Sequence, residues 1–201
     1  MNSKLKIKNI IFDIGGVIIL RRKFNFSKFD RKLFLPKGTT KKTIDLIFKK
    51  SMLNRNFDIE NFFRDNPQLP LTLKQYKGIT KEFYGEEKIN RVLVNWLRGK
   101  NKNYKVFLLT NNTIELNNLL KERFQIFDIF NYIFNSAEIG LAKPDPKFFE
   151  YILKKLKTKP EECLFVDNKK ENIEVAKQLG FYTILFKNNK KFFEKTTKIN
   201  I

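Results

Sequence analysis

The chain has 201 residues, a formal net charge of +20, no histidine and one cysteine. This length allows one substantial core with a modest appended lobe, and the 42% hydrophobic content excludes a disordered chain. The lack of histidine excludes a Ser-His-Asp or Cys-His pair and a histidine-ligated zinc site, so catalysis must use carboxylates, Lys, Thr, Tyr or a metal ion.

The positive charge has two interpretations. A nucleic-acid-binding protein would carry such an excess of basic residues. However, Lys far outnumbers Arg, and Lys, Asn, Ile and Phe are abundant along the whole chain, which favours a compositional drift. We prefer the second interpretation and keep nucleic acid open as a partner, since any anionic substrate would be attracted by the same charge.

The sequence also bears on location. Cys163 alone cannot form an intramolecular disulfide, and the N-terminal residues lack the pattern of a signal peptide. No stretch reaches the roughly 18 uninterrupted apolar residues of a membrane span. We therefore expect a cytoplasmic protein with no membrane partner.

Residues 7–12 form the first predicted strand, an Ile-rich run that stops at Asp13 and continues into Gly15 and Gly16. A continuous apolar run indicates burial on both faces, as in a parallel sheet.

Residues 21–88 predict a helical insertion. Apolar residues have helical spacing at 44–53 and 59–63, a loop is expected at 66–70, and no segment is convincing as a strand. Phe24, Phe26 and Phe29 could line a pocket, although such a trio is more typical of a core. We expect a small helical cap at 21–88, with residues 1–20 and 89–201 forming the core domain.

The remainder alternates strands and helices. Strands are predicted at 106–109, 164–166 and 183–186, and helices at 114–124, 146–156, 172–179 and after Asn188. Asp145 and Pro146 are typical of a helix start, and Gly180 of a helix end. This alternation predicts an α/β fold with a doubly wound, parallel, Rossmann-like sheet.

Ligands of such sheets bind at the carboxyl ends of the strands, so the polar residues that follow each apolar run are the candidate site. Four sequences stand out, namely Phe-Asp-Ile-Gly-Gly-Val at 12–17, Leu-Thr-Asn-Asn at 109–112, Gly-Leu-Ala-Lys-Pro-Asp at 140–145 and Val-Asp-Asn-Lys-Lys-Glu-Asn at 166–172. Each alone is common in turns and helix caps. Their joint order and spacing indicate a functional site.

Together these four sequences resemble the motifs of the haloacid dehalogenase (HAD) superfamily of hydrolases, over nearly the whole chain. The resemblance is strongest to small helical-capped bacterial phosphatases of sugar phosphates, the glucose-1-phosphate phosphatase-like type. It implies a magnesium-dependent enzyme that hydrolyses a small phosphorylated metabolite. By resemblance, Asp13 is the nucleophile that forms an aspartyl-phosphate, and Thr110 and Lys143 are catalytic.

The resemblance also implies the remaining ligands. Gly16, Asn111 and Lys143 would bind the substrate, and Mg²⁺ would be held by Asp13, the carbonyl of Gly15, Asp167 and Asn168.

Two positions depart from the family pattern. Most phosphatases of the superfamily have a second Asp where this chain has Gly15, and that Asp transfers the proton to the leaving group. The superfamily also has two adjacent acids where this chain has Asp167 followed by Asn168, which predicts weaker metal binding. Three alternatives therefore stay open: a non-catalytic phosphate-binding protein, a metal-free dehalogenase and a nucleic-acid-binding protein.

Overall fold

The computed structural model describes residues 7–20, 23–100 and 102–201, and its centre is a five-stranded sheet in the order β5-β4-β1-β6-β7. All neighbouring strands of this sheet are parallel. Its strands are β1 (Asn9–Phe12), β4 (Lys105–Thr110), β5 (Tyr132–Asn135), β6 (Cys163–Asp167) and β7 (Tyr182–Leu185). The predicted α/β fold is confirmed.

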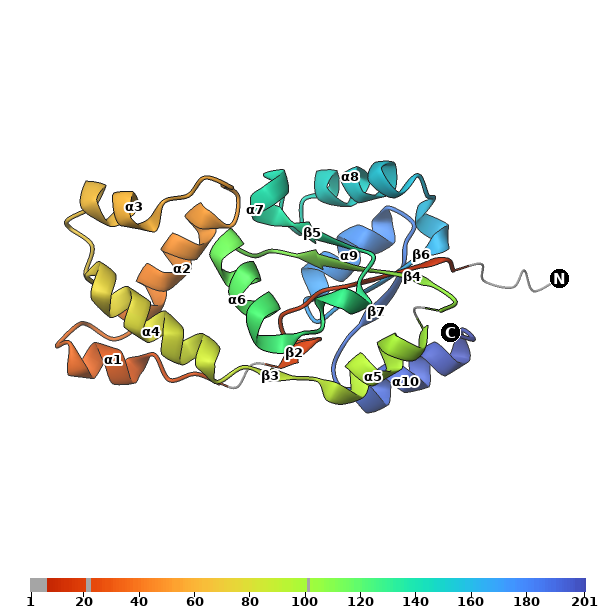
Figure 1. Cartoon of the computed structure of the whole chain (residues 1–201), viewed down its shortest axis with the longest axis horizontal. Coiled ribbons are helices and arrows are strands. Elements are labelled where there is room, and N and C mark those ends of the chain that lie inside the picture. Colours follow the sequence, from red (N-terminus) through yellow and green to blue (C-terminus); the bar gives the residue numbers. More distant parts are fainter. Residues whose placement is uncertain (1–6, 21–22, 101) are drawn as a thin grey trace.

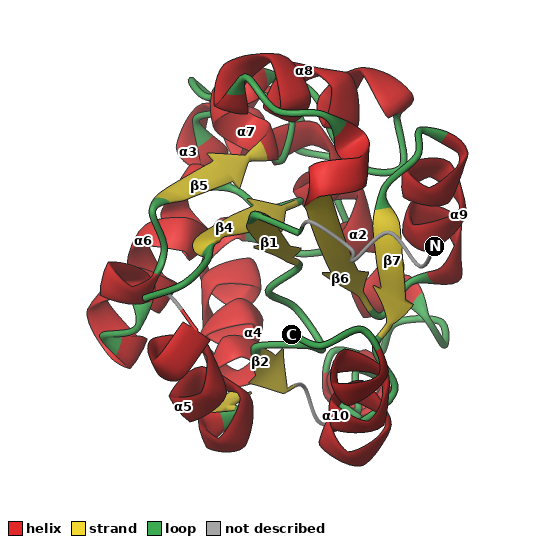
Figure 2. Ribbon diagram, turned by 90° about the vertical axis from the view of Figure 1, so that its right-hand side faces the viewer, coloured by secondary structure: helices red, strands yellow, loops and turns green. Residues whose placement is uncertain are grey.

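Helices cover both faces of this sheet (Figure 2). One face packs on α5 (Arg91–Lys100), α6 (Ile114–Phe124) and α10 (Asn189–Lys198), and the other on α8 (Pro146–Leu156) and α9 (Lys170–Gln178). Alternate residues of each strand serve the two faces. In β1, Ile10 and Phe12 enter the first cluster and Ile11 enters the second, which explains why the strand is apolar from Ile10 to Phe12.

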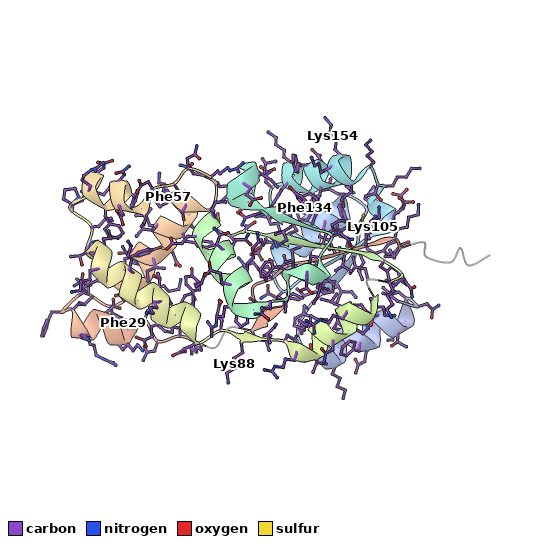
Figure 3. The ribbon with its side chains drawn as sticks, viewed as in Figure 1. Phe29, Phe57, Lys88, Lys105, Phe134 and Lys154 are labelled. Carbon is purple, nitrogen blue, oxygen red and sulfur yellow. The ribbon has the colours of Figure 1, made fainter. Side chains whose placement is uncertain are left out.

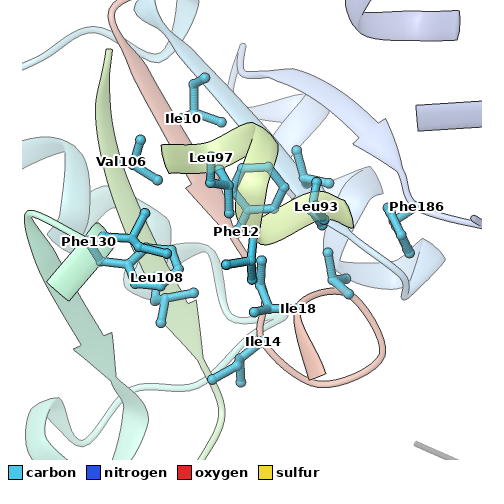
Figure 4. Close-up of a cluster of buried hydrophobic side chains, with 14 of the residues drawn as sticks. Ile10, Phe12, Ile14, Ile18, Leu93, Leu97, Val106, Leu108, Phe130 and Phe186 are labelled. Carbon is cyan, nitrogen blue, oxygen red and sulfur yellow. The ribbon is translucent and has the colours of Figure 1, made fainter. Parts of the chain in front are cut away.

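The first cluster fills the space between the sheet and α5 (Figure 4). There Phe12 and Leu108 of the sheet lie with Leu93 and Leu97 of α5, and all four are fully buried. Burial on this scale stabilises the fold by about 1.5–3 kcal/mol for each large apolar side chain. The core thus holds the carboxyl end of β1 in a rigid setting.

Helix boundaries follow the capping residues. Asp145 accepts a hydrogen bond from the amide of Lys147, and Pro146 occupies the first turn of α8. After α9, Gly180 has a φ of +93°, a conformation that glycine adopts without strain. Both predictions are confirmed, and the bounds predicted for α6 and α8 match those observed.

Four helices form a separate group at one end of the molecule, coloured orange to yellow in Figure 1. They are α1 (Ser27–Lys32), α2 (Thr39–Ser51), α3 (Ile59–Asp65) and α4 (Leu73–Gly85), and we call them the helical lobe. Phe24, Phe26 and Phe29 pack on the lobe's own buried cluster, so the trio belongs to a core. The predicted division into core and cap stays a prediction, and its residues 1–6, 21, 22 and 101 lie outside the described residues.

The chain enters and leaves the lobe through a short antiparallel pair, β2 (Ile19–Leu20) and β3 (Lys88–Ile89), in which Ile19 lies opposite Ile89. Sequence patterns did not predict this pair, because two-residue strands carry no periodicity. Beside it, the guanidinium of Arg123 on α6 donates hydrogen bonds to carbonyl oxygens at the end of α4, those of Tyr84, Gly85 and Glu87.

The sequence also failed to predict β5, the edge strand. Its four residues follow a Phe-rich segment that contains the short 3₁₀ helix η1 (Phe127–Ile129), and such a segment has no clear period. The smaller elements α7 (Ser136–Ile139) and η2 (Pro160–Glu162) complete the chain.

Lysines are spread over the molecule, as the separate positions of Lys88, Lys105 and Lys154 show (Figure 3). Among the described residues, no helix is both long and apolar enough to cross a membrane.

Candidate functional site

Three adjacent strands end at the same place. Phe12 of β1 lies level with Leu108 of β4 and Val166 of β6, and the amide of Asp13 donates to the carbonyl of Val166 at 2.9 Å. Asp13, Thr110 and Asp167 therefore reach the same edge of the sheet, as the motif positions predicted.

Lys143 joins two of these residues in a buried ion cluster. Its Nζ lies 2.6 Å from Oδ1 of Asp13, 2.8 Å from Oδ2 of Asp167 and 2.7 Å from the carbonyl oxygen of Leu109. The Lys143 side chain is only 2% exposed. A buried ammonium is tolerated only when it is paired and hydrogen-bonded, and here all three contacts go to acceptors.

Lys143 is held in place by Asn111. The Asn111 side chain accepts from the amide of Lys143 at 2.9 Å and donates to its carbonyl at 2.7 Å. This two-point contact fixes the backbone of the segment between α7 and α8. The side chain of Asn111 is thus engaged with Lys143, and its predicted contact with a substrate stays a prediction.

Burial and charge shift the pKa values of the pair. Burial raises the pKa of Asp13 above its ordinary value; the ammonium of Lys143 opposes this shift, whereas the carboxylate of Asp167 adds to it. Burial alone would lower the pKa of Lys143, but Asp13 and Asp167 outweigh it and raise that pKa. Lys143 therefore stays a cation between the two carboxylates.

Asp167 has its own hydrogen-bond donors. Its Oδ1 accepts from the amide of Lys169 at 2.8 Å, and its Oδ2 accepts from the side-chain amide of Asn172 at 2.8 Å as well as from Lys143. Both oxygens are thus engaged within the protein. In this geometry Asp167 orients Lys143, and its role as a direct metal ligand stays a prediction.

The two glycines after Asp13 differ in position. Gly15 lines the pocket described next, whereas Gly16 has a φ of +82°, and an added Cβ there would overlap the side-chain amide of Asn168. The conformation at position 16 therefore favours glycine, and a larger residue there would also displace the exposed side chain of Asn168. The predicted contact of Gly16 with a substrate stays a prediction.

A pocket of about 300 Å³ opens above Asp13. Its floor comes from the sheet edge and includes Thr110 and Lys143, and Lys169 and Asn172 lie at its side. The helical lobe supplies the opposite wall from α2 and the residue after it, through the side chains of Asp45, Phe48, Lys49 and Met52. Motif spacing did not predict these four residues, because it carries no information on how a lobe faces the sheet.

Asn112 is a further residue that the motifs did not single out. It is buried, it lines the same pocket, and its Oδ1 accepts from the amide of Thr113. Its side-chain nitrogen finds no hydrogen-bond partner within the part of the chain that the structure describes. An unpaired buried donor costs about 1–3 kcal/mol, so Asn112 is an unsatisfied polar group in the wall of the pocket.

Comparison with known proteins identifies the family. The model of the haloacid dehalogenase-like hydrolases matches residues 7–180, which include all four motifs. The chain belongs to this family. It is therefore a hydrolase, as the resemblance predicted.

Relatives of this family member cover nearly its full length. A D-ribitol-5-phosphate phosphatase from Bacteroides thetaiotaomicron is 27% identical over 96% of this chain and 98% of its own. A HAD family enzyme from the same species, crystallised with magnesium and inorganic phosphate, superposes with a TM-score of 0.69 at 25% identity, covering 91% of this chain and 96% of its own. A predicted HAD-like hydrolase from Porphyromonas gingivalis shares the fold, with a TM-score of 0.73 and 23% identity over 97% and 98% of the two chains.

The oxygen atoms that this family member offers to a cation are few. Gly15 lines the same pocket as Asp13, and the exposed amide of Asn168 approaches Gly16. The described residues hold no group of three or more His, Cys, Asp or Glu side chains that could bind a metal. Carboxylate, carbonyl and amide oxygens are the ligands that Mg²⁺ accepts, with water filling the other positions. The donor set fits Mg²⁺ and provides little negative charge.

Proposed function

We propose that the chain is a magnesium-dependent phosphatase that hydrolyses a small phosphomonoester through an aspartyl-phosphate on Asp13. The observation that carries this proposal is the buried Asp13–Lys143–Asp167 cluster on the floor of a pocket lined by Thr110 and Asn112. A carboxylate held beside a buried lysine, in a pocket also lined by Lys49 and Lys169, is suited to attack an anionic phosphorus centre.

In the first step, a carboxylate oxygen of Asp13 attacks phosphorus, the bond to the leaving oxygen breaks, and the phosphoryl group is carried by Asp13. The Thr110 hydroxyl, on the pocket floor, is the donor that we assign to the phosphoryl oxygens. Lys143 stays protonated and offsets the charge that gathers when a carboxylate meets a phosphate dianion. Water then hydrolyses the aspartyl-phosphate and regenerates Asp13.

Mg²⁺ would be held by Asp13, the Gly15 carbonyl and Asn168, with Asp167 as a further candidate. When bound, the cation neutralises phosphate charge and aligns the phosphoryl group with the nucleophile. A relative crystallised with magnesium and inorganic phosphate supports this proposal.

The substrate that we propose is compact. A pocket of about 300 Å³ accommodates a phosphate with a leaving group of a few carbons, and α2 closes its far side. Sugar and polyol phosphates are the first candidates, since a full-length relative acts on D-ribitol 5-phosphate by its name. Because Gly15 carries no acid, we expect the leaving oxygen to take its proton from water.

The test is release of inorganic phosphate from sugar phosphates, polyol phosphates, nucleotides and an aryl phosphate, with and without Mg²⁺. We expect Mg²⁺-dependent release, and a loss of at least about a thousandfold in Asp13→Asn. Mass analysis after rapid quenching should find one phosphoryl group on the peptide that contains Asp13.

The matched control is Asp128→Asn, which makes the same change at an exposed position of η1. It should keep wild-type activity. Hydrolysis that survives in Asp13→Asn would contradict the proposal, as would hydrolysis that is unaffected by removal of divalent metal.

A second candidate function rests on Gly15 and Asn168, which remove a proton donor and one negative charge from the site. It is a phosphate-binding protein without turnover. Calorimetry with inorganic phosphate and Mg²⁺ separates the two, because binding by folded protein that releases no phosphate from any substrate would favour this second function.

A further inference from the structure

The most exposed large apolar side chain among the described residues is Phe34, in the loop between α1 and α2. It is 97% exposed and has a φ of +53°, in the left-handed region where glycine is preferred. The amide of Leu35 donates to the carbonyl of Asp30 at 2.8 Å, so Phe34 occupies the position after a helix where glycine is usual. A phenyl ring in this setting costs stability and contributes no packing.

The loop around Phe34 is rigidly built. Asp30 is buried, and its carboxylate accepts from the amides of Gly38 at 2.7 Å and Thr40 at 2.8 Å. Leu33 and Leu35, on either side of Phe34, pack on the core of the helical lobe. The neighbours thus pack inward and fix the backbone that presents the ring, which lowers the backbone entropy lost when a partner binds.

The charge around the ring is mostly positive. Residues 23–42 contain seven Lys or Arg residues and a single acid, Asp30, whose side chain is buried. Two of the seven are paired with acids outside this range, Lys28 with Glu82 and Lys41 with Asp45. Arg31, Lys32 and Lys37, within three residues of Phe34, are all exposed. A surface that binds this loop would meet three exposed cations beside the ring, so an anionic surface that accepts an aromatic ring is the best match.

An anionic lipid surface meets both conditions. Exposed aromatic rings flanked by Lys and Arg are the combination with which proteins bind the interfacial region of membranes, the ring entering among the acyl chains and the cations remaining at the headgroups. A nucleic acid would need a series of stacking platforms along a groove, whereas this loop presents one ring. The loop also lies at the tip of the molecule, at the end of α2 that is farther from the sheet (Figure 1).

We propose that Phe34, together with Arg31, Lys32 and Lys37, docks the protein on anionic lipid. The sequence predicted no membrane partner because it has no span, but peripheral docking needs none. α2 has 13 residues, about 20 Å of helix, and it leads from this loop to the pocket wall, so the docked protein keeps its pocket clear of the lipid. The proposal is independent of the reaction at Asp13.

The test is co-sedimentation of the full chain with vesicles of phosphatidylcholine, with or without phosphatidylserine, at physiological salt. We expect binding only when phosphatidylserine is present. Phe34→Gly should weaken it at least about tenfold through loss of the ring. This variant relieves the left-handed strain, so its Tm should equal or exceed that of the wild type, and weaker binding cannot come from unfolding.

Matched controls use exposed residues elsewhere. Val92→Ser removes a 57% exposed apolar side chain from α5 and should bind as the wild type does. Lys32→Gln and Lys37→Gln should each weaken binding about fivefold, whereas Lys154→Gln on α8 should have a much smaller effect.

Three results would overturn the proposal. The first is equal affinity for vesicles with and without phosphatidylserine, and the second is unchanged vesicle binding by Phe34→Gly. The third is a protein that binds neither kind of vesicle but binds an RNA oligonucleotide, with this binding abolished by Phe34→Gly. The last result would assign the loop to nucleic acid instead.

Discussion

Asp13 and Asp30 are both buried aspartates, but their pKa values are shifted in opposite directions. Burial would raise the pKa of Asp30, but hydrogen bonds from Thr40 and from the amide of Gly38 lower it below its ordinary value. The pKa of Asp13 is raised, by burial first and by Asp167 as well, although Lys143 opposes the rise. One carboxylate closes a loop of the helical lobe, and the other forms the floor of the pocket.

The difference teaches how a buried carboxylate becomes available for chemistry. Asp30 is surrounded by fixed amides that satisfy its charge and hold the backbone at Gly38 and Thr40. Asp13 is balanced by a cation that it shares with a second carboxylate, so its charge is tolerated without being fully satisfied. Both aspartates are buried, and the groups that donate hydrogen bonds to each carboxylate decide whether it has a structural or a chemical role.

The largest effect should come from removing the shared cation. Lys143→Met leaves Asp13 and Asp167 buried with no positive charge between them, and we expect unfolding in urea to become easier by about 3–5 kcal/mol, with loss of hydrolysis. The control is Lys154→Met on the exposed side of α8, which should unfold as the wild type does. Stability within about 0.5 kcal/mol of the wild type in Lys143→Met would show that the ion cluster does not stabilise the fold.

A smaller effect is expected at Asp30. Asp30→Asn should lower the free energy of unfolding by about 2 kcal/mol at neutral pH, because one buried amide loses its acceptor, while phosphate release at the distant pocket changes little. The lowered pKa gives this difference a pH dependence. The stabilisation is complete above the unfolded-state pKa, near 3.8, and is lost as pH falls through the lower folded-state value.

Urea unfolding of both proteins from about pH 7 down to about pH 3 measures this difference. Asp128→Asn is again the control, and its difference from the wild type should stay small at every pH. A gap between wild type and Asp30→Asn that widened on acidification would contradict the assignment of Asp30 as a charged, hydrogen-bonded group.

The smallest effect concerns the metal. Asn168→Asp adds one negative charge beside Gly16, and we expect the Kd for Mg²⁺, measured by calorimetry without substrate, to fall about tenfold. The exposed substitution Asn118→Asp on α6 serves as its control. No change in Mg²⁺ affinity would place the cation away from Asn168.

Much of the fold could be predicted because its signals are local. α6 and α8 have apolar residues at helical spacing and clear capping residues, so even their ends were predicted. The four long apolar runs became strands because both of their faces are covered. β5 and the β2–β3 pair could not be predicted, since their residues form strands only through pairing with distant segments.

The candidate site also has a part that could be predicted from the sequence and a part that could not. The motifs placed Asp13, Thr110, Lys143 and Asp167 at one sheet edge, and the structure brings them together. The unpaired nitrogen of Asn112 and the wall from α2 depend on side-chain packing and on the placement of the lobe. These features leave no trace in residue spacing.

The two strands that connect the helical lobe to the sheet are bonded to each other, with Ile19 opposite Ile89 and Leu20 opposite Lys88. The two chain segments that join the lobe to the sheet are therefore held side by side. Arg123 of α6 donates to carbonyl oxygens at the end of α4 and so adds a second connection between the lobe and the rest of the chain. The position of the α2 wall over Asp13 is therefore set by contacts that lie outside the pocket.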